Sequence, residues 1–165
     1  MPKGTGNLDS ELQRFFSQAA EILAKNMRNA LARLGEETVA YAKDRGPDES
    51  WIDHTQNLRS SIGYALYENG YETIASVFSG MGSKGTAEGR KMISDLAKEY
   101  SNTAFALVVV AAMEYAEYVE ALENKDVLAS AELKAKAKVE SVLQKAIEKS
   151  EKEIEKLGFD VTITI

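Results

Sequence analysis

Gly80-Met-Gly-Ser-Lys-Gly85 spells the phosphate-binding pattern G-x-G-x-x-G between an expected strand and an expected helix. In the dinucleotide fingerprint, the backbone of such a loop holds a pyrophosphate, and an acidic residue follows about 20 positions later within a parallel βαβ unit. The corresponding stretch here, Ser101–Phe105, holds no acid, and the preceding strand belongs to an antiparallel hairpin. No Lys-Ser or Lys-Thr pair follows Gly85, as a P-loop requires. We therefore expect no bound nucleotide and no other cofactor.

Two further groups have side chains that could move protons or hold a metal. His54 lies between Asp53 and Thr55, and a histidine titrates near neutral pH. It has no second histidine, cysteine or G-x-S-x-G segment to complete a catalytic site. A stripe of carboxylates at three-residue steps could bind a hard cation, although such stripes are mostly solvent or interface faces. Its members are Glu114, Glu117 and Glu120. We expect no catalytic residue, no metal and no enzymatic activity.

The composition removes other classes of protein. The chain has 165 residues, no cysteine and one histidine, which excludes disulfides, thiolate zinc sites and iron–sulfur clusters. Twenty basic against 26 acidic residues give a formal charge of −6, which argues against sequence-specific nucleic-acid binding. No apolar run is long enough to cross a bilayer, and the amino terminus does not resemble a secretory signal, so we expect no membrane partner.

Helical and strand periods divide the chain into eight elements. Apolar residues three or four apart predict a long helix from Leu8 to Ala42, with Gly35 as a candidate kink. An acidic loop at 46–56 and a short turn at 57–60 follow. Asn69-Gly70 between two β-rich runs, Ile62–Glu68 and Tyr71–Phe78, predicts a hairpin with a type I′ turn. Unbroken pairing would bring one set of residues to a single core-facing side. The set is Ile62, Tyr64, Leu66, Tyr71, Thr73, Ala75 and Val77.

The second half of the chain alternates between helices and strands. Four glycines within 80–89 predict a flexible loop, and a short helix follows at 92–100. The apolar run Thr103–Ala111 predicts a buried strand, and 113–120 a helix. A second long helix begins at Ser130, its expected cap, and Phe159–Ile165 alternates as a final strand. We therefore predict one α+β domain over 1–165 with a flexible terminus at 1–7. Its sheet would have about four antiparallel or mixed strands, with the long amino- and carboxy-terminal helices on one face.

Two short segments resemble a known family. Asp53–Gly63 reads D-H-T-Q-N-L-R-S-S-I-G, and Tyr115–Glu120 reads Y-A-E-Y-V-E. They resemble the D-x-T-G-x-L-x-x-S-I and Y-A-x-Y-V-E segments of the tailed-phage tail-component family, whose members sit at the head–tail junction. The order of elements is similar too, so the resemblance spans nearly the whole chain.

The chain also departs from the family pattern at two places. Gln56 replaces a common glycine, so we expect that the turn before Asn57 need not be left-handed. Ala121-Leu122 replaces Gly-Thr, which favours a continued helix. If the chain is a member, these differences make it a divergent one.

The resemblance implies a non-enzymatic structural protein of a phage or prophage. It would assemble as a ring, with a hexamer favoured, that completes the tail or joins it to the head. Its partners would be copies of itself and the phage connector and tail-tube proteins, in the virion or in the bacterial cytoplasm during assembly. The acidic stretch 111–128 would face basic residues of a neighbour, and the glycine loop would become ordered there. The expected subunit-interface residues are Arg59, Met81, Lys84, Arg90, Lys91, Tyr115, Glu117, Tyr118 and Glu120.

Two other readings remain open from the sequence. One is a host α+β binding or regulatory module that dimerises through its long amphipathic helices. The other is an enzyme that uses the glutamates or His54.

Overall fold

A computed structural model describes residues 5–44, 52–78, 80–100, 102–121, 126–158 and 161–164. By their contacts the residues form two compact units. The first unit comprises Met1–Ala30 and Glu140–Ile165, and the second unit Leu31–Val139. Each unit is described by itself below. No helix among the described residues is long and apolar enough to cross a membrane.

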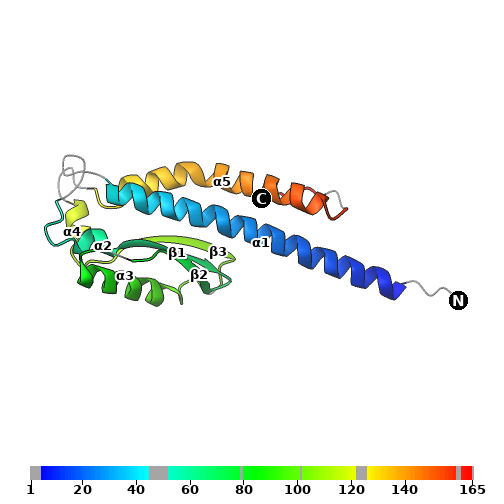
Figure 1. Cartoon of the computed structure of the whole chain (residues 1–165), viewed down its shortest axis with the longest axis horizontal. Coiled ribbons are helices and arrows are strands. Elements are labelled where there is room, and N and C mark those ends of the chain that lie inside the picture. The colour runs from blue at the N-terminus through cyan, green and yellow to red at the C-terminus, as the bar shows by residue number, and fades with distance from the viewer. Residues whose placement is uncertain are drawn as a thin grey trace. The chain divides into compact units, whose positions relative to one another are not determined.

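From α1 to α5 the described elements follow the predicted order, except that a short helix, α2, takes the place of the turn expected at 57–60 (Figure 1). They are α1 (Thr5–Asp44), α2 (Asn57–Ser61), β1 (Ile62–Glu68), β2 (Tyr71–Ala75), α3 (Ser83–Leu96), β3 (Phe105–Ala111), α4 (Ala116–Ala121) and α5 (Ala129–Glu155). The helix α1 begins at Thr5, inside the segment expected to be flexible, and residues 1–4 lie outside the described part. Gly35 lies within an uninterrupted helix rather than at a break. The α+β class is therefore confirmed.

The sheet of the second unit is antiparallel, in the order β2-β1-β3. Asn69 and Gly70 both have positive φ, 51° and 84°, which confirms the type I′ requirement of the predicted hairpin. We expected about four strands, and three are found among the described residues. The fourth was Phe159–Ile165, of which 161–164 form no strand and the rest lies outside the described residues.

A β-bulge changes which residues of the hairpin share a face. Glu68 pairs with Tyr71, as expected, but the register shifts after Tyr67, so that Leu66 pairs with Ile74 instead of Thr73. The expected common face is therefore wrong beyond the bulge. Ile74 packs on the same side as Tyr64, while the expected member Ala75 packs with Ala65 and Tyr67 on the opposite side. Thr73 and Val77 are exposed, and so is Tyr71, which lies before the bulge and keeps its expected pairing. An extra residue in one strand inverts the alternation of every residue beyond it.

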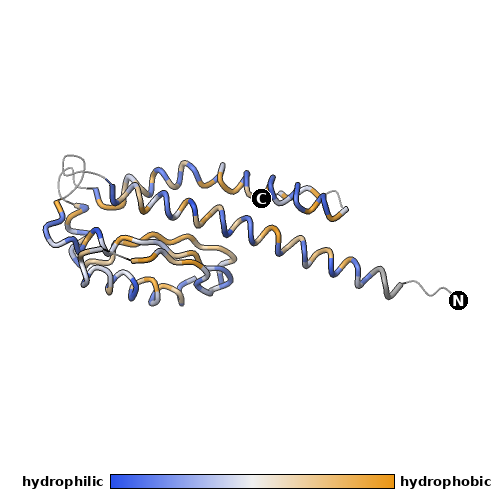
Figure 2. Tube along the Cα trace, in the orientation of Figure 1, coloured by the Kyte–Doolittle hydropathy of each residue, from blue (hydrophilic) through white to orange (hydrophobic). Residues whose placement is uncertain are grey.

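Helices cover both faces of this sheet (Figure 1). On one face, Ile62 and Tyr64 of β1 pack with Val39 and Ala42 of α1 and with Ala131 of α5. The two long helices thus share one face, as predicted. On the other face β1 and β3 pack against α3, through a second cluster. Its buried members are Ala65, Tyr67, Phe78, Ile93 and Val110. Figure 2 shows the resulting pattern, with hydrophobic strands between helices that alternate in hydropathy.

The glycine-rich segment 80–89 is not the loop that we expected. The helix α3 begins at Ser83, and Gly82, Gly85 and Gly89 are all buried. A Cβ at Gly89 would lie 2.4 Å from the Phe78 ring. Gly85 and Gly89 are four residues apart and lie on one face of α3, and Gly82 precedes the helix; all three allow the close approach of neighbouring elements.

The first unit is built on the paired parts of α1 and α5. Asn26 of α1 is buried and its amide Nδ2 donates to Ser150 Oγ of α5 at 3.1 Å. Residues 161–164 return along α5, where the Ile163 N–H donates to Glu151 Oε1 at 2.8 Å. This pair of helices is amphipathic, in agreement with the periodicity of both sequences.

Candidate subunit interface

The first family-like segment, Asp53–Gly63, builds the start of α2. Asp53 Oδ2 accepts a hydrogen bond from the Arg59 N–H at 2.7 Å, and Thr55 Oγ1 accepts one from the Asn57 N–H at 3.3 Å. A carboxylate at a helix N-terminus satisfies N–H groups that have no partner inside the helix. His54 is exposed beside this cap. The Asp-x-Thr pattern therefore has a structural role in this chain.

Gln56 adopts a left-handed backbone conformation, although we expected that this turn need not be left-handed where glutamine replaces glycine. Its φ is 58° and its ψ is 7°. Our expectation for this turn was therefore wrong. The side-chain Nε2 donates to the Asp53 carbonyl at 3.1 Å, and the Gln56 carbonyl accepts from the Ser60 N–H, so the surrounding bonds hold the residue in this conformation.

The start of α3 packs directly on α2. The Gly82 N–H donates to Ser60 Oγ and the Gly85 N–H donates to Asn57 Oδ1, both at 3.1 Å. A Cβ on Gly85 would lie 1.9 Å from the Asn57 carbonyl oxygen. Two of the N–H groups that a phosphate cradle would present, those of Gly82 and Gly85, are thus bonded to α2. The glycines of G-x-G-x-x-G allow two helices to approach each other closely.

The second family-like segment, Tyr115–Glu120, leads into α5. Ala116 is buried, while Tyr115, Glu117 and Tyr118 are exposed. Glu120 accepts three backbone hydrogen bonds of 2.8–2.9 Å, from the N–H groups of residues 127–129. Glu120 is therefore engaged within its own chain, unlike the exposed Glu117.

The start of α5 also differs from the sequence prediction. We expected Ser130 to cap the helix, but α5 begins at Ala129 and Ser130 lies inside its first turn. Asp126 accepts hydrogen bonds from both the N–H and the hydroxyl of Ser130. Glu120 and Asp126 together supply the acceptors, and their negative charges favour this helix end.

The two family-like segments meet in the core of the second unit, although more than 50 residues separate them. Leu58 and Ile62 of the first segment and Ala116 of the second belong to one hydrophobic cluster. The Ala112 N–H also donates to the Ser61 carbonyl at 3.3 Å. The structure thus brings together two segments that the sequence singled out separately.

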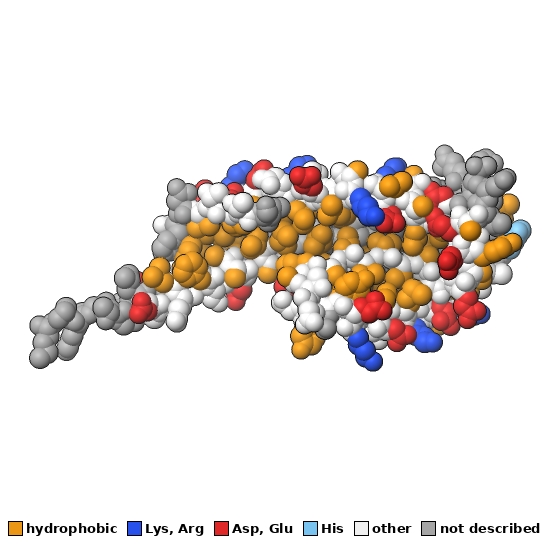
Figure 3. All heavy atoms as spheres, turned by 180° about the vertical axis from the view of Figure 1, so that it is seen from behind, with side chains coloured by type: hydrophobic (Ala, Val, Ile, Leu, Met, Phe, Trp, Pro, Cys, Tyr) orange, Lys and Arg blue, Asp and Glu red, His pale blue; other side chains and the backbone are white. Residues whose placement is uncertain are grey.

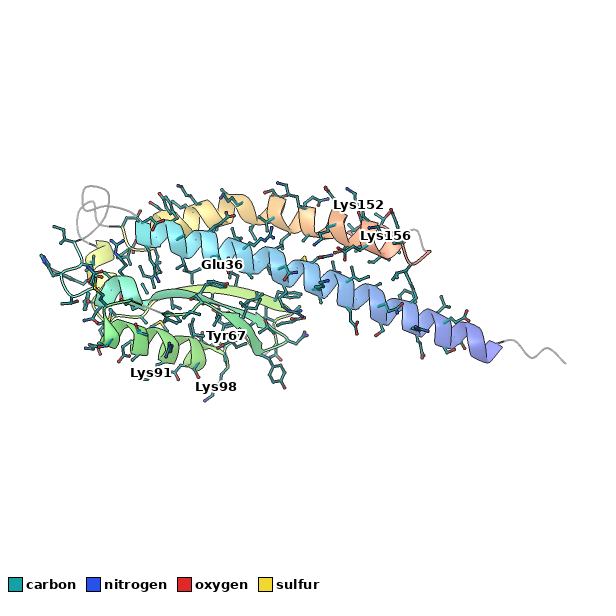
Figure 4. The ribbon with its side chains drawn as sticks, in the orientation of Figure 1. Glu36, Tyr67, Lys91, Lys98, Lys152 and Lys156 are labelled. Carbon is teal, nitrogen blue, oxygen red and sulfur yellow. The ribbon has the colours of Figure 1, made fainter. Side chains whose placement is uncertain are left out.

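An open groove runs between α3 and α4. Its volume is about 560 Å³, and Lys91 on α3 lines it together with Glu114 and Glu117. Three more carboxylates of the α3 region line it, from Glu88, Asp95 and Glu99. Lys91 and the acidic stretch, which we expected on opposite sides of a contact between two copies, thus border one groove of a single chain. Figure 4 places Lys91 on the side of α3 that faces away from the sheet, and Lys98 just after the end of this helix.

The other expected interface residues lie on the same elements. Met81, just before α3, is 86% exposed, and Tyr118 on α4 is 68% exposed. Lys84 and Arg90 are exposed on α3. Arg59 on α2 is half-buried. The pKa of Lys43 lies below its usual range, because Lys43 is itself partly buried and because the positive charge of Arg59 lies nearby.

Comparison of the chain with known proteins found no relative. No known protein family, no functionally characterised protein and no solved structure matches it. Among the described residues, no three of His, Asp and Glu lie close enough to hold a metal ion. The residues that sequence reasoning missed are Asn57, Ser60 and the three buried glycines Gly82, Gly85 and Gly89, whose spacing of three and four residues was visible but was attributed to a loop.

Proposed function

We propose that this protein is a non-enzymatic structural protein of a phage or prophage, and that it assembles as a ring at the head–tail junction. The observation that supports the proposal best is the meeting of the two family-like segments in one core. The two segments resemble one family and occur in the same order. In this structure they also pack in one hydrophobic cluster, beside the hydrogen bond from the Ala112 N–H to the Ser61 carbonyl. The proposed partners are copies of the chain and the phage connector and tail-tube proteins.

The exposed side chains around these segments form the proposed contact surface. Met81 and Tyr118 are large apolar or aromatic side chains that are mostly exposed, and such residues are enriched in protein interfaces. Lys84 and Arg90 lie on α3, and Glu117 lies on α4. Charges of both signs on neighbouring elements suit a head-to-tail contact between identical copies, because each copy then offers both sides. The ordering of a glycine loop by a neighbour is no longer part of this proposal.

The experiment is sedimentation of the concentrated protein with negative-stain imaging, repeated on two matched variants. Tyr118→Asp and Leu133→Asp each place a charge on a side chain that is 68% exposed, the first on α4 and the second on α5. We expect rings from the unaltered chain and from Leu133→Asp, and none from Tyr118→Asp. Rings that survive Tyr118→Asp would remove α4 from the proposed interface.

The second candidate, a module that dimerises through its long helices, has one observation in its favour. On α1, Phe16 is 64% exposed and Leu12 is 39% exposed, and Figure 3 shows apolar side chains gathered along a face of the helices. The variant Phe16→Asp separates the two candidates. A stable dimer that dissociates in Phe16→Asp and persists in Tyr118→Asp would support the dimeric module and contradict the ring.

A further inference from the structure

The strand β3 forms one edge of the described sheet. Among the described residues the sheet ends at β3, which pairs only with β1. Its seven residues, Phe105–Ala111, include no charge and no proline, and Phe105 to Val109 are only half-buried. A long apolar edge strand is a template for pairing with a further chain, because its outward N–H and C=O groups have no ladder partner.

The opposite edge of the sheet has protective features that β3 lacks. The strand β2 has only five residues, Glu72 places a charge on it, and the bulge at Thr73 interrupts its register. Short length, charge and bulges are the features by which edge strands avoid pairing. Because the β2 edge has these protective features and the β3 edge lacks them, we expect an added strand to pair with β3.

The chain also contains a further segment with the sequence pattern of a strand, of which the described part, 161–164, forms no strand. Phe159–Ile165 has seven residues, the length of β3, with apolar residues at alternate positions. In the described part, Val161 and Ile163 are half-buried and Thr162 and Thr164 are exposed, yet no ladder forms. One hydrogen bond, from the Ile163 N–H to Glu151, holds this part against α5.

We propose that β3 of one copy accepts the carboxy-terminal segment 159–165 of a second copy as the fourth strand of its sheet. The strand would have one apolar and one polar face, with Asp160 on the polar one, which suits an outermost position. Main-chain hydrogen bonds would supply affinity and the alternate apolar side chains specificity. Each copy would then give one strand and receive one, a head-to-tail contact that closes into a ring when the rotation allows. Only this closure rests on the proposed function.

The absence of cysteine from the chain makes disulfide mapping a direct test. One chain carries Val108→Cys or Val109→Cys on β3, and a second chain, distinguished by a tag, carries Ile163→Cys. We expect disulfides between the two differently sized chains under mild oxidation. The matched control places the first cysteine on the protected edge, as Glu72→Cys, where we expect none. Equal cross-linking at Glu72→Cys would overturn the assignment to β3.

Truncation after Gly158 and a synthetic peptide of residues 159–165 complete the test. We expect the truncated chain to keep its circular dichroism, to remain monomeric, and to bind the peptide but not a scrambled version. If the truncated chain still forms rings, strand addition is refuted and the proposed ring stands. If the peptide binds and cross-links at β3 but the full chain never forms rings, strand addition stands and the ring is refuted. A disulfide only within one chain, in the variant with both cysteines, would overturn the second copy as donor.

Discussion

The left-handed conformation of Gln56 predicts that Gln56→Gly has a higher free energy of unfolding than Gln56→Ala. Its φ of 58° lies where side chains with a Cβ are strained. We compare two variants, Gln56→Gly and Gln56→Ala. Both remove the hydrogen bond from Gln56 Nε2 to the Asp53 carbonyl. Only the glycine variant relieves the backbone strain, so the difference between the two variants isolates the conformation.

The magnitude follows from three contributions. A left-handed residue with a Cβ costs about 1–2 kcal/mol, which glycine avoids. The greater freedom of glycine in the unfolded chain removes roughly 0.5–1 kcal/mol of this gain. Loss of the partly buried side-chain hydrogen bond costs both variants about 0.5–1.5 kcal/mol. We therefore expect Gln56→Ala to be destabilised by about 1 kcal/mol, and Gln56→Gly to be more stable than Gln56→Ala by about 0.5–1 kcal/mol.

Urea unfolding followed by far-ultraviolet circular dichroism measures these differences, since a shift in midpoint at constant slope reports stability. The matched control is the same pair of substitutions at His54, which is exposed and does not have positive φ. At His54 the alanine variant should be the more stable one. The reasoning is wrong if alanine is also the more stable residue at position 56.

Three further predictions concern packing, capping and titration. Gly85→Ala should destabilise the fold by at least about 2 kcal/mol, because its Cβ meets a backbone oxygen of α2, whereas the exposed Ser83→Ala should have little effect in the same urea assay. Glu120→Ala should cost about 2–3 kcal/mol, because three N–H groups lose their acceptor. Glu117→Ala, on the same helix and exposed, should be nearly neutral, and equal losses would contradict the capping role. Burial, and then nearby acidic groups, raise the pKa of Tyr67 from 10.0 to about 12, so its stabilising contribution is complete below pH 10 and is lost as the pH rises toward 12. Ultraviolet absorbance should show a last tyrosine ionisation that disappears in Tyr67→Phe.

Local features of the fold could be predicted from the sequence because their causes lie within a few residues. The Asn69-Gly70 turn needs only two residues with positive φ, and both have it. The long helices follow from a period that repeats over many turns. The bulge at Thr73 could not be predicted in this way, because it satisfies two cores at once by turning Ile74 toward α1 and Ala75 toward α3.

The candidate interface was predictable only in part, for a related reason. The two family-like segments were visible in the sequence, but the roles of their polar residues depend on partners elsewhere. The charge of Glu120 suits an interface, which is what we expected from the sequence. In the structure its carboxylate instead caps the start of α5, because it accepts hydrogen bonds from the N–H groups of residues 127–129. The buried glycines depend in the same way on distant partners, because Gly82 and Gly85 lie against the start of α2 and Gly89 lies against the Phe78 ring.

The buried amide of Asn26 has a consequence for how α1 and α5 align within the first unit. Apolar stripes on two helices pack almost equally well after a slide of one turn, about 5.4 Å. Such a slide would take Asn26 Nδ2 away from Ser150 Oγ and leave the buried amide without this acceptor, at about 1–3 kcal/mol. The Ser150 hydroxyl would keep its own bond to the Ala146 carbonyl of α5. In the observed alignment Asn26 Nδ2 has its acceptor, while its Oδ1 has no partner among the described residues. The chain thus gives up some packing energy at this layer and in return distinguishes one alignment of the helices from all the others.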